Sequence, residues 1–81
     1  FNPRTTLKAV LPAPGTWSLT IHDHRGRVVD RVGPVDRPAG VWRYVWSGED
    51  ATGSQVASGV YEAVLVGPEG RRSRVRLTLV R

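Results

Sequence analysis

The sequence predicts an all-β fold, a single sandwich of six to eight antiparallel strands. Two observations predict it. Apolar and polar residues alternate with a period of two in short runs, and the helical period does not occur. Nine glycines and six prolines stand between these runs, where they favour turns. Hydrophobic residues make up 40% of the 81 residues and charged residues 23%, which is typical of a globular domain and too apolar for a disordered chain.

The expected strands follow from these runs in chain order. Each run ends at glycine, at proline or in a polar loop, which places strands at residues 5–11, 16–23, 28–32, 41–46, 60–66 and 72–80, with a very short one at Val56. Residues 12–15, 24–26 and 67–70 are expected to form tight turns, with Gly26 at positive φ. Residues 33–40, which contain two prolines, are expected to form a crossing loop, and residues 47–54 a polar loop.

Alternate residues of the expected strands are apolar and should face a core between two sheets. These residues are Leu7, Ala9, Leu11, Trp17, Leu19, Ile21, Trp42, Tyr44, Trp46, Tyr61, Ala63, Leu65, Val75, Leu77 and Leu79. Trp46 and Tyr61 are among the largest of them, so we expect them to fill the space between the sheets.

Basic residues exceed acidic ones by 12 to 7, for a formal net charge of +5, and Lys8 is the single lysine. Arginines crowd the C-terminal strand, and their positions define a possible interaction surface: Arg71, Arg72, Arg74 and Arg76. A solvated strand face explains such arginines most simply, because their stems pack on the sheet. A polyanion-binding surface is the alternative. Nucleic acid is not expected as a partner, because the aromatic residues are predicted inside and the arginines outside.

Residues that could carry chemistry are few. His22 and His24 face the same side of a strand and could hold a metal, but no third ligand is near in sequence, and Asp23 is better explained as a turn residue. Asp50 lies in a polar loop without the acidic spacing of a calcium-binding EF-hand, so we expect it to accept backbone N–H groups. There is no cysteine, which excludes disulfides and thiolate sites. No catalytic residue, metal site or cofactor is expected.

The domain organisation expected from the chain is one domain over residues 1–81. The sequence begins at Phe1 and contains no methionine, so we expect it to be a module of a longer protein or a processed product. No apolar run approaches the ~20 residues of a membrane-spanning helix, and the run that ends at Val66 is broken by Gly67.

Two stretches of the sequence indicate a protein family more specifically than the composition does. The first covers residues 19–29 and reads Leu-Thr-Ile-His-Asp-His-Arg-Gly-Arg-Val-Val. The second, over residues 40–61, contains Trp-Ser-Gly-Glu-Asp-Ala-Thr-Gly at 46–53 and ends in Ala-Ser-Gly-Val-Tyr. Together with the opening Phe-Asn-Pro-Arg-Thr-Thr, they resemble the Ig-like domain of the flagellar hook-capping protein FlgD. The resemblance covers essentially the whole chain, and the same module recurs in C-terminal sorting domains of type IX secretion.

Several positions depart from this family's usual pattern. Ser47 stands where the family usually has aspartate, which replaces one loop acceptor by a hydroxyl. Ala9 stands where a larger apolar residue is common. The last strand is rich in arginine rather than lysine, and the chain starts partway through the family's usual Asn-Pro opening.

The resemblance implies an Ig-like or fibronectin-III-like sandwich whose recurring residues serve the fold. Glycines permit turn geometries, aspartates accept loop amides and aromatic side chains fill the core. The fold-defining set is Trp17, Asp23, Gly26, Trp46, Gly48, Asp50, Gly53, Gly59 and Tyr61. No catalytic residue is implied.

The implied function is that of a non-catalytic C-terminal accessory domain in a secreted or cell-envelope bacterial protein. It would serve sorting, surface attachment or assembly, outside the cell or at its surface. Its partners would be the parent protein's other domains, the secretion machinery or neighbouring subunits. Two alternatives stay open. The first is a self-assembling subunit of a filament or homo-oligomer that pairs through the terminal strands, residues 5–11 and 72–80, with Val10 and Val80 facing outward. The second is a polyanion-binding module that uses the C-terminal arginines.

Overall fold

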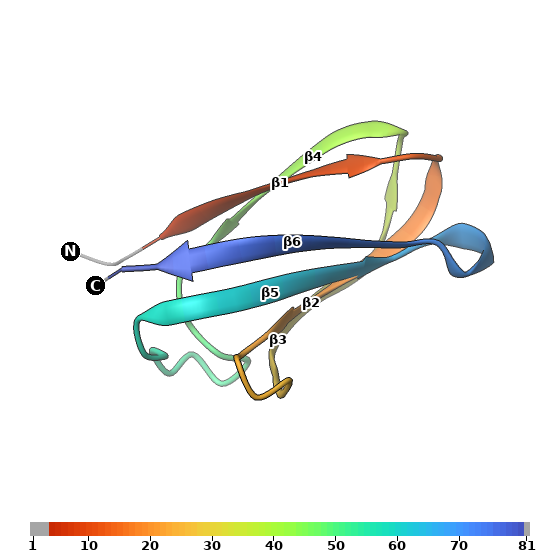
Figure 1. Ribbon diagram of the computed structural model, residues 1–81. Helices are drawn as coiled ribbons and strands as arrows, with labels where there is room; N and C mark the ends of the chain where they lie inside the picture. Colours follow the sequence, from red (N-terminus) through yellow and green to blue (C-terminus); the bar gives the residue numbers. More distant parts are fainter. Residues whose placement is uncertain (1–3, 81) are drawn as a thin grey trace.

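Six strands and one short 3-10 turn make up the chain in the computed structural model, which describes residues 4–80. In chain order the elements are β1 (Thr5–Leu11), β2 (Gly15–His22), β3 (Val28–Arg37), β4 (Gly40–Trp46), β5 (Gly59–Val66), η1 (Pro68–Gly70) and β6 (Arg72–Leu79). Figure 1 shows them wrapped into a sandwich that measures 35 × 23 × 20 Å. In this described part of the chain, no helix is long and apolar enough to cross a membrane.

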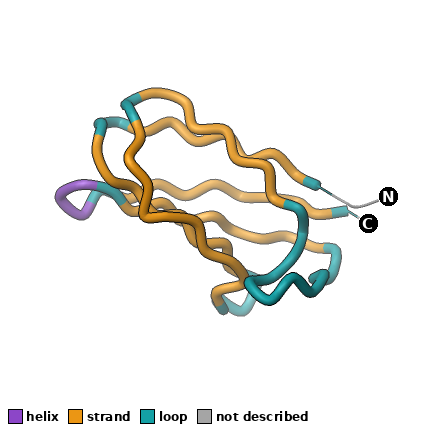
Figure 2. The backbone as a smooth tube through the Cα atoms, turned by 180° about the vertical axis from the view of Figure 1, so that it is seen from behind, coloured by secondary structure: helices purple, strands orange, loops and turns teal. Residues whose placement is uncertain are grey.

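The strands form two antiparallel sheets. β1 pairs with β4 alone, and the larger sheet has the order β3-β2-β5-β6. Figure 2 shows the same two layers from behind. This arrangement confirms the predicted antiparallel sandwich. β1 and β6 belong to different sheets but lie side by side, so the edges of these two strands face one another.

The core lies between the sheets and is built from alternate strand residues. Thirteen apolar residues are buried there: Leu7, Ala9, Leu11, Trp17, Leu19, Ile21, Trp42, Trp46, Tyr61, Ala63, Leu65, Leu77 and Leu79. The two other residues expected to face inward, Tyr44 and Val75, are partly buried and pack against this cluster. No polar or charged residue among those described is buried. The period-two pattern therefore predicted the core correctly, because burying one face of each strand fixes its register.

The prediction of a crossing loop over residues 33–40 is wrong for its first part. β3 continues to Arg37, and Val35, Asp36 and Arg37 pair with the start of β2. The register shifts between Trp17 and Leu19, which marks an irregularity of the ladder near Pro34. β3 is an edge strand, and a proline is tolerated at an edge or a bulge because no ladder hydrogen bond is lost there.

The prediction of a short strand at Val56 is also wrong. Glu49 and Gln55 form an isolated bridge instead, and the Val56 N–H donates to the Gly48 carbonyl at 3.0 Å. Val56 packs against the core from this loop. Its partial burial, rather than strand pairing, accounts for an apolar residue at this position.

The turn between β5 and β6 closes over Trp17. The Gly67 N–H donates to the Arg71 carbonyl at 2.8 Å, and the Arg71 N–H donates to the Pro68 carbonyl at 3.1 Å. A Cβ atom on Gly67 would lie 2.5 Å from the Trp17 ring, closer than real contacts allow. Glycine is required at this position because the backbone approaches a buried indole.

Candidate functional site

The residues singled out in the sequence fall into two groups in space. One group forms turns and aromatic contacts that stabilise the fold, and the other forms a basic surface.

The first turn joins β2 to β3. One carboxylate oxygen of Asp23 accepts the backbone N–H groups of Arg25 at 2.9 Å and Arg27 at 3.0 Å, and the other accepts from Arg27 Nε at 3.1 Å. The Gly26 N–H donates to the Asp23 carbonyl at 2.9 Å. These donors, the Arg27 amide first, lower the pKa of Asp23.

The second turn repeats this arrangement in the loop after β4. Asp50 Oδ1 accepts the Thr52 hydroxyl at 2.7 Å and the amides of Thr52 and Ser54 at 2.9 and 3.0 Å. The Gly53 N–H donates to the Asp50 carbonyl at 3.0 Å. The Thr52 hydroxyl is the main cause of the lowered pKa of Asp50.

Both turns therefore use the same four-residue pattern, Asp-x-x-Gly. In each, the aspartate accepts the amides two and four residues further on, and the glycine takes a positive φ, +81° at Gly26 and +87° at Gly53. The sequence shows this repeat at residues 23–26 and 50–53, and it marks two equivalent turns. Sequence reasoning treated the two aspartates separately and missed the repeat.

The aromatic residues fill the core and also close loops. Trp46 and Tyr61 pack edge to face with centroids 4.9 Å apart, and Trp46 Nε1 donates to the Glu49 carbonyl at 3.0 Å. The Tyr61 hydroxyl donates to the Ala57 carbonyl four residues upstream, the contact known as a tyrosine corner in Ig-like sandwiches. Trp17 Nε1 donates to the Ala13 carbonyl at 3.1 Å.

The two remaining glycines of the fold-defining set, Gly48 and Gly59, lie near the two ends of the loop between β4 and β5. Gly48 lies against Leu79 of β6, where a Cβ atom would be 3.1 Å from the leucine methyl groups. Gly59 is the first residue of β5. Every residue of the set thus lies in the core, in a turn or loop, or at the start of a strand.

Of the two histidines considered as metal ligands, His22 is hydrogen-bonded within the protein. The Thr20 hydroxyl lies 2.8 Å from His22 Nε2, and His22 Nδ1 lies 3.3 Å from the Gly26 carbonyl oxygen. Because a carbonyl only accepts, Nδ1 carries a proton and both ring nitrogens have partners within the protein. Within residues 4–80, no three histidine or carboxylate side chains gather as a metal would require.

A smaller hollow of about 430 Å³ lies between the two Asp-x-x-Gly turns and is lined by both aspartates. Their carboxylates already accept turn amides, so they serve the turns and are poorly placed to accept a proton from a substrate.

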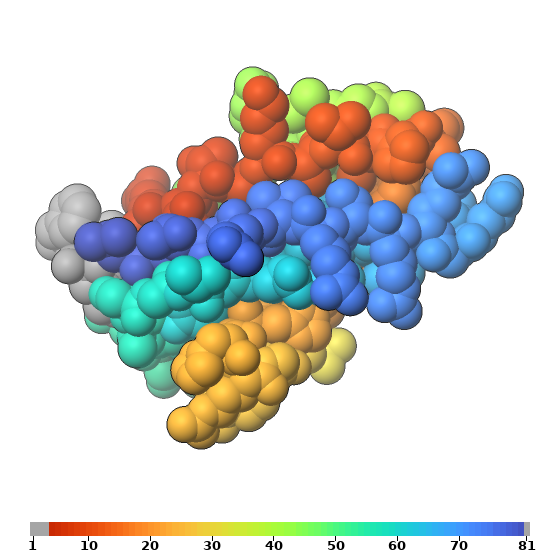
Figure 3. Space-filling view, viewed as in Figure 1, coloured from red at the N-terminus to blue at the C-terminus, as the bar shows by residue number. Residues whose placement is uncertain are grey.

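The larger hollow lies on the outer face of the four-stranded sheet and has a volume of about 660 Å³. We call it the basic groove. Its principal side chains come from all four strands: Arg72, Arg74 and Arg76 from β6, Val60, Glu62, Val64 and Val66 from β5, Thr20 and His22 from β2, and Val28 and Arg31 from β3. Figure 3 shows this face, with β6 in blue, β5 in cyan and the β2–β3 hairpin standing out in gold below them.

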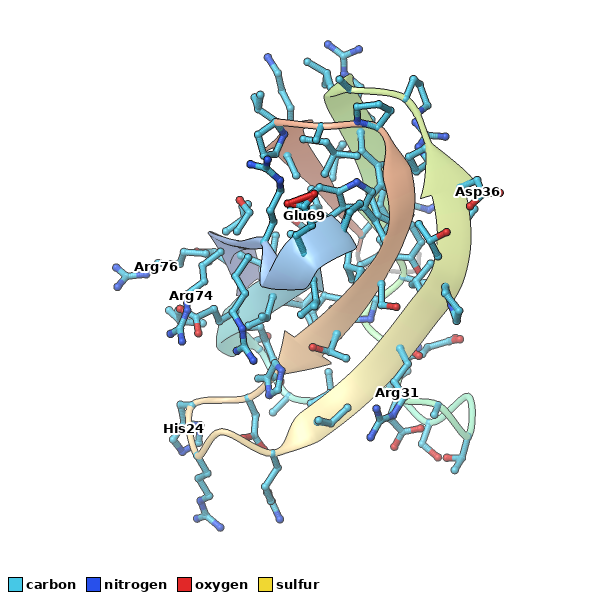
Figure 4. All side chains as sticks on the ribbon, turned by 90° about the vertical axis from the view of Figure 1, so that its right-hand side faces the viewer. His24, Arg31, Asp36, Glu69, Arg74 and Arg76 are labelled. Carbon is cyan, nitrogen blue, oxygen red and sulfur yellow. The ribbon has the colours of Figure 1, made fainter. Side chains whose placement is uncertain are left out.

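Strand register explains why these residues meet. Arg74 is paired with Val64, Val64 with Thr20, and Thr20 with Arg31, so one row crosses the whole sheet. Strands lie about 4.8 Å apart, which separates the two arginine backbones by roughly 14 Å. Figure 4 shows Arg74 and Arg76 projecting from the β6 side and Arg31 from the β3 side, with the hairpin that carries His24 below.

The groove is positively charged. Four arginines line it against two carboxylates, Glu62 and Asp23, and Asp23 is bonded into its turn. Arg74 Nη1 lies 3.4 Å from Glu62 Oε1, with side chains 64% and 47% exposed. An ion pair this exposed contributes at most about 1 kcal/mol, so it breaks readily when another anion arrives.

The structure brings three of the four arginines of the predicted interaction surface together. Arg72, Arg74 and Arg76 line the basic groove, but Arg71 does not, because it ends the η1 turn one residue before β6. Arg31 was missed. It lies alone in the sequence, and only the β2–β3 register brings it to the same face.

Two facing antiparallel sheets and the tyrosine corner define an Ig-like β-sandwich domain. The sequence profile of the FlgD Ig-like domain matches residues 4–70, and the chain belongs to that family. The match includes all the fold-defining residues and ends before β6, which carries three of the groove arginines.

Solved structures agree in fold. FlgD from P. aeruginosa superposes with a TM-score of 0.72 at 24% identity over 95% of this chain. FlgD from Xanthomonas campestris, described as giving insight into hook capping essential for flagellar assembly, has a TM-score of 0.67 at 21% identity over 96% of the chain. The chain spans 59% and 58% of the length of those two proteins. A comparison with curated protein sequences finds no match.

Proposed function

We propose that this chain is a non-catalytic assembly domain of a larger bacterial protein that acts at the cell exterior. Membership of the FlgD Ig-like family is the observation that carries the proposal, because one solved structure of that fold is a hook-capping protein of flagellar assembly. The domain would hold its parent protein to a neighbouring subunit, to the cell surface or to the secretion machinery.

The use of the motif residues supports a structural role. Asp23 and Asp50 bond turn amides, and Trp46 and Tyr61 bond loop carbonyls and fill the core. These side chains make their contacts within the domain, whereas the outer faces of the sheets remain accessible to a partner. Such a division is expected of a domain that binds through its surface rather than one that converts a substrate.

Deletion of the domain from its parent protein tests the proposal. We expect the truncated protein to be made at normal levels but to be lost from its place of assembly, as measured by immunoblots of secreted, surface-bound and cytoplasmic fractions. An unrelated Ig-like sandwich of the same length in the same position is the control for spacing. Unchanged export and retention after deletion would contradict the proposal.

A second candidate function is self-assembly through a free strand edge. The terminal strands were the predicted edges, but β1 and β6 lie side by side, which leaves them less open than expected. β4 pairs only with β1, and Val10 and Val41 form an outward-facing pair on that small sheet, 65% and 47% exposed. Unpaired edges can add a strand from another chain. Under this alternative, sedimentation and electron microscopy of concentrated protein would show oligomers or filaments, and a monodisperse monomer would exclude it.

A further inference from the structure

We infer that the basic groove binds an extended acidic segment of a partner polypeptide, with carboxylates at alternate positions. This inference rests on the proposed function and gives that function a specific surface and a partner chemistry. Three features of the groove favour such a ligand: its charge, the spacing of its arginines and its aliphatic floor.

Charge selects an acidic partner and argues against a second copy of this chain. The chain has seven acidic residues against twelve basic ones, and the acidic residues do not form a strip. All seven are already engaged or dispersed. Asp23 and Asp50 accept amides in turns, and Glu62 pairs with Arg74 in the groove. Asp36 accepts the Thr16 hydroxyl at 2.6 Å, Asp30 accepts the Arg31 amide, and Glu49 and Glu69 lie in separate loops. In Figure 4, Asp36 lies on the β3 side of the molecule and Arg74 and Arg76 lie on the opposite side of the view. The described residues 4–80 of another copy therefore offer no complementary acidic face.

The spacing of the β6 arginines favours an extended polypeptide as the ligand. Arg72, Arg74 and Arg76 project from alternate residues of β6, so their backbones are about 6.6–6.8 Å apart along the strand. A partner segment in the same extended conformation presents every second side chain at the same interval. Carboxylates at alternate positions can therefore meet successive guanidinium groups, each through charge-assisted hydrogen bonds.

The floor of the groove suits a polypeptide better than a nucleic acid. Between the arginines of β6 and Arg31 lie the short aliphatic side chains of Val60, Val64 and Val66. Tyr61 also lines the groove, but it is 7% exposed and its ring packs on Trp46. Base stacking needs exposed aromatic faces. Among the described residues, no exposed Phe, Tyr or Trp lines the groove, and its two histidines lie at its hairpin end, where His22 is bonded to the Thr20 hydroxyl.

Glu62 acts as an internal competitor for the proposed ligand. It bonds Arg74 across the strand pair, in the position that a partner carboxylate would take. Removing its charge should free Arg74 and strengthen binding. A non-specific attraction to the net positive charge of the chain would not depend on this residue in particular.

Fluorescence anisotropy with labelled synthetic peptides tests the inference. The probes are a short peptide in which Glu and Thr alternate, one of identical composition with the glutamates in a block, and one in which Gln replaces Glu. We expect the alternating peptide to bind best, the block peptide more weakly and the Gln peptide not at all. Binding should weaken as salt is raised, because exposed charges are screened.

Matched variants locate the site. Arg74→Gln and Arg76→Gln should each weaken binding of the alternating peptide about two- to fivefold at low ionic strength. Arg43→Gln removes the same charge from an exposed position in the opposite sheet and should leave binding nearly unchanged. Glu62→Gln should strengthen binding more than Glu69→Gln, which lies outside the groove.

Three results would overturn the inference: equal binding of the alternating and block peptides, an equal loss from Arg43→Gln and Arg74→Gln, or tighter binding of a single-stranded oligonucleotide that depends on the groove arginines. The proposed function is tested separately by domain deletion. If deletion disrupts assembly but a parent protein with Arg74→Gln and Arg76→Gln assembles normally, the groove inference fails while the assembly role stands.

Discussion

Replacing Gly67 with alanine tests how tightly the β5–β6 turn packs on the core. The backbone φ of Gly67 is −128°, which alanine adopts without strain, so the substitution changes packing alone. The added Cβ atom would lie 2.5 Å from two atoms of the Trp17 ring and 2.6 Å from a third. Ordinary contacts are about 3.4–4 Å, so the ring or the turn must move by about 1 Å.

The expected cost follows from what holds Trp17. The indole is fully buried and donates to the Ala13 carbonyl at 3.1 Å, so it cannot move without disturbing the core and that bond. Overpacking costs about 1–3 kcal/mol, and a strained hydrogen bond adds about 1 kcal/mol. We therefore expect Gly67→Ala to lower the free energy of unfolding by about 2–4 kcal/mol. A domain of this size has roughly 4–12 kcal/mol in total.

Urea denaturation followed by tryptophan fluorescence measures this loss. In a Trp17→Phe background, where a smaller ring leaves room, Gly67→Ala should cost at least about 1 kcal/mol less. Gly70→Ala is the control for backbone effects, since its Cβ would meet nothing but its φ is +72°, and it should cost about 1 kcal/mol. A loss under about 0.5 kcal/mol for Gly67→Ala, or the same loss in both backgrounds, would refute the packing argument.

Three further predictions concern the turns and aromatic contacts. Trp46→Ala should lower the free energy of unfolding by about 3–5 kcal/mol because it empties a fully buried site; a loss under about 1 kcal/mol in chemical denaturation would show that Trp46 is not a core residue. Tyr61→Phe keeps the ring but removes the donor to the Ala57 carbonyl, so denaturation should show a loss of about 1 kcal/mol, and an unchanged midpoint would mean that the tyrosine corner contributes nothing. The pKa values of Asp23 and Asp50 lie below the ordinary 3.8 in the folded state, so the unfolded chain binds protons more readily in acid. Stability linked to these groups is present above pH 3.8 and is lost as the pH falls through their folded pKa values. Thermal unfolding across this range should therefore show a smaller acid loss for Asp50→Asn, and an acid profile identical to that of the parent would contradict the turn's role.

Much of the fold could be predicted from the sequence because burial on one face imposes a period of two. All six strands were expected at or near their observed positions, and the inward residues were identified from alternation alone. The extension of β3 to Arg37 was missed because Gly33 and Pro34 normally indicate a break. An edge strand tolerates proline, but whether a strand lies at an edge depends on the whole topology.

The basic groove was less predictable than the fold. Arg72, Arg74 and Arg76 share a face through simple alternation, and the sequence shows this. Arg31 joins them only because β3 pairs with β2 and β2 with β5. Such cross-strand neighbours depend on sheet order and register, which no local pattern in one sequence specifies. The side-chain pairing of Glu62 with Arg74 could not be foreseen for the same reason.

The most direct measurement on the groove is a titration of the isotopically labelled chain with the alternating Glu-Thr peptide, followed by amide chemical shifts. We expect the largest shift changes at the outward-facing residues of β6 and β5 and smaller changes at Thr20 and Arg31. The amide shifts of the β1–β4 sheet should stay unchanged. Shifts centred on β1 and β4, or spread evenly over all arginines of the chain, would contradict the assignment of the four-stranded face as the partner-binding surface.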